Sequence, residues 1–132
     1  MSYDITKSQL EILNVMWAAG EPLSRGDILE RSSDKSWKGS SIHILLNGLL
    51  EKGLIEGAGF TRAGKVWGRL YAPTITVEEY YASILKAGPV CDRVRLLKLI
   101  LDGEELDKKT ADAMVKEIKN ARAAKTDKAD ET

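Results

Sequence analysis

The side chains best suited to chemistry in this sequence are hydroxyl, imidazole and amide groups that follow one another within residues 38–47. Groups of these types donate hydrogen bonds to phosphates, and they donate to or accept from the edges of bases. Asn47 can pair with adenine through two hydrogen bonds, and Ile44 can contact the methyl group of thymine. These residue types predict contacts with double-stranded DNA, made by Lys38, Ser40, Ser41, His43, Ile44 and Asn47.

A solvated helix surface is the competing interpretation of the same residues, because a polar outer face is the default for an amphipathic helix. No lysine or arginine occurs between residues 39 and 51, so the face lacks the fixed cations that DNA-reading helices usually carry. Ile44 favours a covered surface, and Gly48 contributes no side chain while costing a helix about 0.5–1 kcal/mol relative to alanine. On residue types alone, both interpretations stay open.

Basic residues concentrate between Lys35 and Arg69, where six lysines and arginines accompany two acidic residues, a local net charge of +4. The whole chain is neutral, with 20 basic and 20 acidic residues, which disfavours indiscriminate coating of nucleic acid. Arg62 and Lys65 lie in a glycine-containing turn between two strand-like runs, where they can neutralise phosphates. The pattern predicts a modest electrostatic contact surface for DNA, with a solvated basic face as the alternative.

Residues typical of catalytic sites are scarce. The chain has one histidine and one cysteine, and its adjacent carboxylates Glu78 and Glu79 fall on a predicted amphipathic helix where solvation explains them. We find no nucleophile elbow, no glycine-rich phosphate loop and no spaced Cys/His cluster. We therefore expect no enzyme activity, no cofactor and no metal site, and we expect Cys91 to be a small buried hydrophobe.

Three helices are expected before residue 54. Thr6 and Gln9 form a capping-box pattern that predicts a helix from Lys7 to Ala19, ending at Gly20. Ser24 is expected to cap a second, short helix that runs through Arg31. The third helix carries the polar stretch and ends at 52–53, with apolar positions for an inner face at Ile42, Leu45, Leu46, Leu49 and Leu50.

Two strand-like runs follow, at 54–60 and 66–73, around the basic turn. Three helices and then a hairpin is the order of elements in a winged helix-turn-helix domain. Trp37, just before the third helix, is expected to pack under it, whereas Trp67 fits either the core or the outer face of the wing. The predicted fold class is mostly α with a small antiparallel β wing, followed by C-terminal dimerisation helices.

The remainder of the chain is predicted to be helical, at 77–86, 90–101 and 108–123. Three helices of this length cannot bury their aliphatic faces alone, so a second copy of the chain is the expected cover. We divide the sequence into a winged-helix domain at 1–75, a dimerisation region at 76–124 and a disordered tail at 125–132. Dimer contacts are expected from Tyr80, Ile84, Val90, Val94, Leu97, Leu101, Met114 and Ile118.

The sequence also bears on location. No run of 18 apolar residues occurs, so no membrane insertion is expected. The first residues lack a basic region followed by an apolar stretch, so no secretory signal is expected. A single cysteine suits a reducing compartment. We therefore expect a cytoplasmic protein.

Several motifs, in this order, resemble the BlaI/MecI/CopY-type penicillinase repressors. They are "ITKSQLEILNVMW" at 5–17, "SW" before the third helix, "LLNGLLEKGLI" at 45–55, "GRLYAP" at 68–73 and "TVEEYY" at 76–81. The resemblance implies a homodimeric repressor whose winged-helix domains enter successive major grooves of a pseudo-palindromic operator and whose C-terminal helices interlock. It also implies an inducing partner, a membrane sensor-protease or another inducing system.

Three positions depart from the family pattern. The family usually has Lys or Arg where this chain has His43, Thr where it has Ile44, and Arg where it has Gly48, whereas Ser41 and Asn47 fit. The family's asparagine-phenylalanine cleavage site and its cysteine-rich copper motif have no counterpart in this sequence. The leading prediction is a sequence-specific DNA-binding transcriptional repressor with altered or relaxed specificity. The alternative is a winged-helix protein-interaction module that has lost DNA reading, and a ligand-responsive regulator is a weaker third.

Overall fold

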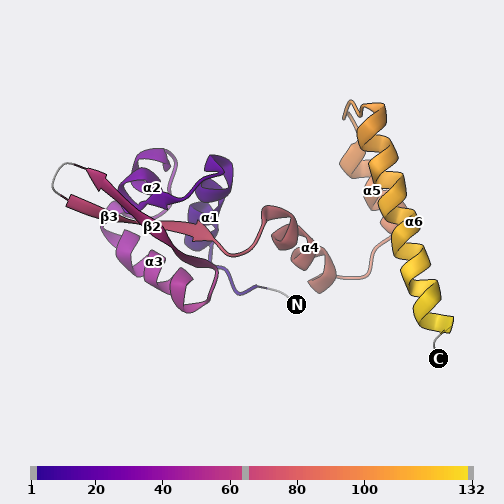
Figure 1. Cartoon of the computed structure of the whole chain (residues 1–132), viewed down its shortest axis with the longest axis horizontal. Helices are drawn as coiled ribbons and strands as arrows, with labels where there is room; N and C mark the ends of the chain where they lie inside the picture. Colours follow the sequence, from indigo (N-terminus) through magenta and orange to yellow (C-terminus); the bar gives the residue numbers. More distant parts are fainter. Residues whose placement is uncertain (1–2, 64–65, 131–132) are drawn as a thin grey trace. The chain divides into compact units, whose positions relative to one another are not determined.

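The computed structural model describes residues 3–63 and 66–130, and the chain divides between Val90 and Cys91 into two compact units. Figure 1 shows the order of the elements along the chain. The described elements of the first unit are α1 (Lys7–Ala19), β1 (Leu23–Ser24), α2 (Arg25–Arg31), a 3-10 turn (Gly39–Ser41), α3 (Ile42–Glu51), β2 (Ile55–Ala63), β3 (Val66–Pro73) and α4 (Val77–Ala87).

A side-chain cap at Thr6 begins α1, and Gly20 ends it. The Thr6 hydroxyl accepts a hydrogen bond from the backbone N–H of Gln9 at 3.3 Å, and the Gln9 side chain accepts one from the N–H of Thr6 at 3.1 Å. Gly20 ends the helix in the left-handed conformation, with φ of 68°. The predicted bounds of this helix are confirmed.

The start of α2 is held in the same way. The Ser24 hydroxyl accepts from the N–H of Asp27 at 3.2 Å, and the Asp27 carboxylate accepts from the N–H of Ser24 at 3.1 Å. The hydrogen bond from the Ser24 backbone N–H favours the charged carboxylate and, followed by the Ser24 side chain, lowers the pKa of Asp27 from its ordinary value. The prediction that Ser24 caps a helix ending at Arg31 is confirmed.

The core of the first unit lies between α1, α2 and α3. Ile12, Leu13 and Leu49 are wholly buried, and Trp37 lies under the start of α3, as predicted, with only 7% of its surface exposed. Leu45 and Leu50 pack at the edge of this cluster, half-buried. The other buried members are Met16, Leu23, Ile28, Ile42, Leu46, Leu54 and Ile55.

The wing is a three-stranded antiparallel sheet with the strand order β1-β3-β2, so the expected two-stranded hairpin gains a strand. β1 pairs with β3 through Leu23 opposite Tyr71, and its two residues are too few to carry an alternating pattern. The pairing of β2 with β3 shifts register between Gly57 and Phe60. Figure 1 shows the β2–β3 hairpin projecting beyond α2 and α3.

The last helix of the first unit, α4, is attached through Trp17 of α1. The indole N–H of Trp17 donates to the carbonyl oxygen of Ile75 at 3.0 Å, and the rings of Trp17 and Tyr80 lie 5.7 Å apart. A capping box of Thr76 and Glu79 begins α4. The structure therefore groups α4 with the winged helix, whereas the sequence-based division places the boundary after residue 75.

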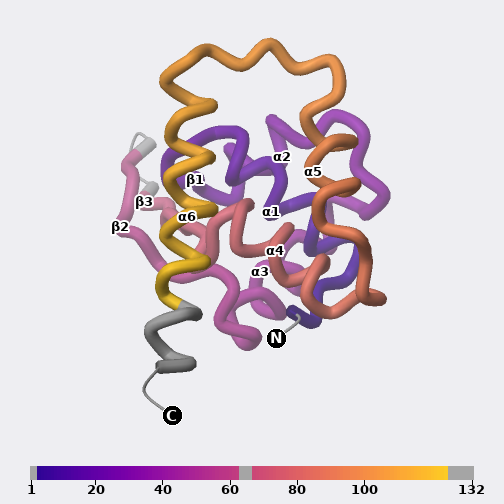
Figure 2. The backbone as a smooth tube through the Cα atoms, turned by 90° about the vertical axis from the view of Figure 1, so that its right-hand side faces the viewer, coloured from indigo at the N-terminus to yellow at the C-terminus, as the bar shows by residue number. Residues whose placement is uncertain are grey.

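The second unit consists of α5 (Arg93–Leu101) and α6 (Lys108–Asp130). Figure 2 shows the two helices and the turn at 102–107 that joins them. The Asp92 carboxylate caps α5 by accepting from the N–H groups of Val94 and Arg95, so the prediction of a helix from Val90 is wrong by three residues. Cys91 consequently precedes the helix and is exposed, which corrects the expectation of burial.

The helix α6 begins at an aspartate cap and continues into the stretch predicted as a tail. The Asp107 carboxylate accepts from the N–H of Thr110 at 2.8 Å, and hydrogen bonding with Thr110 lowers the pKa of Asp107. The helix extends to Asp130. Among the described residues, no helix is long and apolar enough to cross a lipid bilayer.

Candidate nucleic-acid interface

The polar stretch enters α3 through a tight turn. The carbonyl oxygen of Lys38 accepts from the N–H of Ser41 at 2.8 Å, which closes the 3-10 turn. Lys38 and Ser40 are exposed there, and Ser41 is half-buried. These three predicted contact residues therefore lie at the start of α3, where helical N–H groups are available to an anion.

The outer face of α3 carries three more of the predicted residues. His43, Ile44 and Asn47 are all exposed, and Ile44 exposes 75% of its surface. The opposite face is fixed in the core by Ile42 and Leu49, both nearly inaccessible. The structure thus brings His43, Ile44 and Asn47 to one accessible surface, and their contact with DNA stays a prediction.

Gly48 lies on the flank of α3 that approaches α1. A Cβ atom at this position would come within 2.9 Å of the Gln9 side-chain nitrogen, and Gln9 is itself buried, with 7% exposure. The Gln9 oxygen also accepts from the Lys52 ammonium at 2.8 Å. Close packing therefore explains the glycine, and an arginine at 48 requires Gln9 to move.

Lys52 is held at the end of α3 by these contacts. Besides Gln9, its ammonium lies 3.8 Å from the carboxylate of Asp4. Its backbone N–H donates to the carbonyl oxygen of Gly48 at 3.1 Å. Lys52 thus joins the start of α1 to the end of α3 rather than extending toward a ligand.

Arg25 contributes a cation that the sequence did not point to. It is the first residue of α2, and its guanidinium hydrogen-bonds to His43 Nε2. A guanidinium can only donate, so Nε2 is the acceptor in this hydrogen bond. The contact joins residues 18 positions apart, and no local pattern signals such a pairing.

A groove of about 420 Å³ separates this pair from the wing. Arg69 of β3 lies on the wing side, with its guanidinium over the Tyr71 ring at 5.4 Å. A Cβ atom on Gly57 would lie 2.8 Å from that guanidinium, so the glycine leaves it room. The side chains that line the groove include Arg25, His43, Thr61, Trp67, Arg69 and Tyr71.

The hairpin carries the other predicted phosphate contacts. Arg62 is exposed, and its guanidinium lies over the Trp67 ring at 5.7 Å. Trp67 exposes 64% of its surface, which excludes the core for this residue, and it lines the groove beside Arg69. Phe60 exposes 68% of its surface. Lys65 lies outside the described residues.

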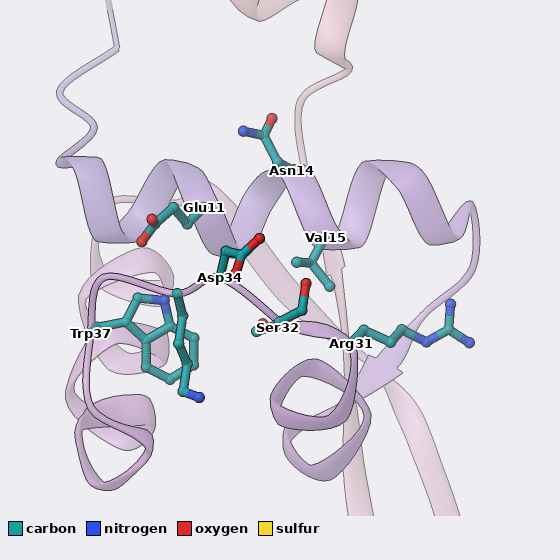
Figure 3. A pocket seen from close by; sticks show the side chains of 9 residues that line it. Glu11, Asn14, Val15, Arg31, Ser32, Asp34 and Trp37 are labelled. Atoms are coloured by element: carbon teal, nitrogen blue, oxygen red, sulfur yellow. The ribbon is translucent and has the colours of Figure 1, made fainter.

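A separate cavity of about 200 Å³ lies between α1 and the connection from α2 to α3 (Figure 3). The Glu11 carboxylate accepts from the Ser36 hydroxyl at 2.6 Å and from its N–H at 3.3 Å. The Lys35 ammonium lies 5.8 Å from the centre of the Trp37 ring. Both signs of charge line this cavity, and its contacts fix the segment that leads into the 3-10 turn.

The predicted dimer residues fall in both units. Tyr80 is half-buried against Trp17 of its own chain, Ile84 exposes 50% of its surface, and Val90 and Val94 are almost fully exposed. An apolar groove of about 580 Å³ lies on the second unit. Its lining includes Leu97, Leu101, Leu106, Ala111, Met114 and Ile118.

Three helices, a β wing, an exposed helix face and a groove with two arginines define a winged helix-turn-helix protein of the DNA-binding class. A family model described as penicillinase repressor matches residues 5–120. The chain belongs to this family and is a DNA-binding transcriptional regulator, a repressor.

Two solved structures are similar to the chain at a distance. One is Bacillus subtilis PadR in complex with operator DNA, with 21% identity, a TM-score of 0.47, and coverage of 89% of this chain and 70% of that one. The other is a mutant of MepR from a multidrug-resistant S. aureus clinical isolate, with 16% identity, a TM-score of 0.46, and coverage of 92% and 80%. No curated protein sequence matches the chain. Both likenesses are too distant to assign a role to any residue here.

Proposed function

We propose that the chain is a homodimeric, sequence-specific repressor that binds a pseudo-palindromic operator. The observation that carries this proposal is the exposed face of α3 with Ile44 and Asn47. The same helix contributes His43 to a groove that Arg25 and Arg69 also line. A recognition helix in the major groove reads base edges, while cations beside it contact phosphates. The presence of both kinds of group supports the proposal.

Base reading is assigned to the outer face of α3. Asn47 pairs with adenine, and Ile44 packs against a thymine methyl group. Ser40, Ser41 and Lys38, at the start of the helix, contact phosphates, as do Arg62 on the wing and Lys65. A good bidentate pair discriminates against a wrong base by about 1–3 kcal/mol, so one asparagine supports a moderate sequence preference.

A second copy of the chain is assigned to the second unit. Val94, Leu99 and Ile118 expose more than half of their surfaces, and contiguous apolar surface of this kind marks an interaction site. Within the described residues of this unit, α5 and α6 are the two helices available, and many of their apolar side chains are exposed. A twofold-related pair buries each copy's groove against the other, and it places two α3 helices on two half-sites.

Selection of bound fragments from a random DNA pool tests the function. We expect enriched sequences with two inverted half-sites about 10 base pairs apart, bound with an affinity that falls steeply as salt rises. Asn47→Ala is expected to lose preference at one base of each half-site, whereas Glu51→Ala, an exposed neighbour without hydrogen-bond donors, keeps the preference. Absence of saturable binding at low salt contradicts the proposal.

Exposed apolar side chains favour a second candidate function, a winged-helix module for protein contacts. Ile44, Phe60 and Trp67 each expose more than 60% of their surface, on α3 and the wing. His43→Lys restores the cation that the family pattern has at this position, and position 48 is unsuited to the same test because Gln9 fills the space. DNA binding that occurs only in the His43→Lys variant supports the interaction module.

The cellular location and the regulation of the protein follow from the first proposal. A repressor acts where the chromosome is, so we assign the protein to the cytoplasm. The inducing partner is assigned to a sensor system that acts on the protein. A shift of the operator complex on addition of extract from induced cells, with loss or retention of full chain length, separates proteolytic from non-proteolytic induction.

A further inference from the structure

We propose that the groove between α2, α3 and the wing binds a DNA phosphodiester, and that Arg25 supplies there the positive charge that α3 lacks. In this proposal His43 positions Arg25 and is not a reader of bases. The inference rests on the proposed operator binding and specifies one part of it. It assigns a role to Arg25, which the resemblance to the penicillinase repressors does not mark.

The first step is the distribution of charge around α3. No lysine or arginine occurs between residues 39 and 51, so the helix offers an incoming phosphate only neutral donors. Arg25 begins α2, and its hydrogen bond to His43 places a guanidinium beside the exposed face of α3. Arg25 of α2 therefore supplies a positive charge beside α3, which has no lysine or arginine of its own.

The second step is the hydrogen-bonding capacity of that guanidinium. Arginine has five N–H donors in a planar fork, and His43 Nε2 accepts from one of them. The remaining donors suit the paired oxygens of a phosphate, which arginine binds in a bidentate manner. Because the imidazole acts through its acceptor nitrogen, the role of His43 is to orient Arg25.

The third step is the second wall of the groove. Arg69 lines it from β3, and its guanidinium is positioned by the Tyr71 ring and by the space that Gly57 leaves. None of the described residues that line this groove is acidic. Two arginines from different elements thus face one space without a carboxylate between them, an arrangement that favours an anion.

The location of the groove indicates which anion binds there. It lies between α3, which carries the exposed polar face, and the β2–β3 hairpin, which carries Arg62. With α3 in a major groove, as proposed, the backbone phosphates that border that groove lie beside the helix. A phosphodiester of the DNA backbone is therefore the ligand that the groove fits.

Arg25→Ala in the full-length protein tests the proposal. With the selected operator and with an unrelated duplex as the two probes, we expect affinity to fall about tenfold for both, since phosphate contacts carry no sequence information. We also expect the slope of log affinity against log salt to become shallower by about 0.9. Arg25→Lys, which keeps the charge, should retain part of the affinity.

The matched control is Arg31→Ala. Arg31 is an exposed arginine of the same helix, α2, and it is paired with Glu21 at 3.5 Å rather than lining the groove. Its removal changes the net charge by the same amount, so we expect affinity and salt slope to stay close to those of the wild type. Thermal unfolding of each variant confirms that the fold is retained.

Variants at position 43 test the positioning role. In the Arg25→Ala background, His43→Lys should restore affinity to within about threefold of the wild type, because the charge then comes from α3. His43→Ala should lower affinity when Arg25 is present and have little effect when it is absent. Equal losses from His43→Ala in both backgrounds contradict positioning and assign direct contact to His43.

The outcomes separate this inference from the operator proposal. A wild-type protein that shows no saturable binding overturns both. A wild-type protein that binds its selected operator, with Arg25→Ala indistinguishable from Arg31→Ala, overturns only the role of Arg25. A loss confined to the operator, with the unrelated duplex unaffected, makes Arg25 a base reader and overturns the phosphate assignment.

Discussion

At the scale of single residues, His43 and Gly48 depart from the family pattern for different physical reasons. His43 is exposed and hydrogen-bonded to an arginine from another helix, so a change at this position redistributes charge without disturbing packing. Gly48 faces the buried Gln9, whose side-chain nitrogen would lie 2.9 Å from a Cβ atom and would have to shift. The glycine is therefore part of the contact between α1 and α3 and is not an empty reader position.

The packing of Gly48 predicts a coupling with Gln9. Gly48→Ala gains about 0.5–1 kcal/mol of helix propensity but has to displace a side chain that caps α1 and binds Lys52. We expect the substitution to be neutral or destabilising alone and stabilising in a Gln9→Ala background, measured by denaturant unfolding. Gly26→Ala in α2 is the control, because its nearest atom lies at an ordinary 3.8 Å, and it should behave alike in both backgrounds.

The Asp27 carboxylate predicts a pH dependence of stability. Its pKa is lowered mainly by the hydrogen bond from the backbone N–H of Ser24 and then by the Ser24 side chain. A group whose pKa is lower in the folded state stabilises that state above its unfolded pKa and loses the effect as pH falls through the folded value. We expect Asp27→Asn to cost about 0.5–1 kcal/mol at pH 7.

The unfolding free energy, measured over a series of pH values, gives the sign of this pH dependence. The difference in unfolding free energy between the wild type and Asp27→Asn should be constant from pH 7 to about pH 5 and should shrink as pH falls below about 4. Glu30→Gln is the matched control, an exposed carboxylate of the same helix, and it should show little difference at any of these pH values. A difference that grows on acidification contradicts the assignment to the Ser24 cap.

At the scale of elements, the parts that could be predicted are those encoded within a few residues. Thr6 with Gln9, and Ser24 with Asp27, are capping pairs three residues apart, and both helix starts followed from them. β1 was missed because two residues show no alternation, and it exists only by pairing with β3. The Arg25–His43 contact was missed for a similar reason, since packing of α2 against the rest of the unit creates it.

The attachment of α4 predicts an effect of the Trp17 indole N–H. Trp17→Phe keeps an aromatic ring near Tyr80 but removes the hydrogen bond to the Ile75 carbonyl. We expect a loss of about 1 kcal/mol of stability and faster hydrogen exchange in α4 than in α2. Trp67→Phe, at an exposed position of the wing, is the control and should change stability by less than about 0.5 kcal/mol. Equal exchange rates for α4 in both variants argue against this attachment.

At the scale of the whole molecule, the two units differ in how completely they bury their apolar side chains. Among the described residues of the first unit, eleven apolar side chains are buried in one core. In the second unit, the apolar side chains of α5 and α6 are mostly exposed and line a groove of about 580 Å³. Exposed aliphatic surface of this extent marks an interaction site, and the proposed dimer would cover it.

Leu97→Glu tests that dimer, because Leu97 lines the groove and exposes 42% of its surface. A carboxylate there cannot be buried against a second copy without a large desolvation cost. We expect sedimentation to give a dimer for the wild type and a monomer for the variant at micromolar concentration. The melting temperature should rise with concentration for the wild type and be independent of concentration for Leu97→Glu.

The control for this prediction is Lys98→Glu. Lys98 is the next residue of α5 and does not line the groove, so the variant carries the same new carboxylate on the same helix. It should remain dimeric and bind operator DNA, whereas Leu97→Glu should bind a single half-site with the weak affinity of one winged helix. In a dimer, binding of one half-site brings the second winged helix close to the other half-site, which raises affinity by about 10²–10⁴. A monomer lacks this gain, so its affinity for the operator should be lower by about the same factor. A dimeric Leu97→Glu variant with wild-type affinity rules out this groove as the dimer contact.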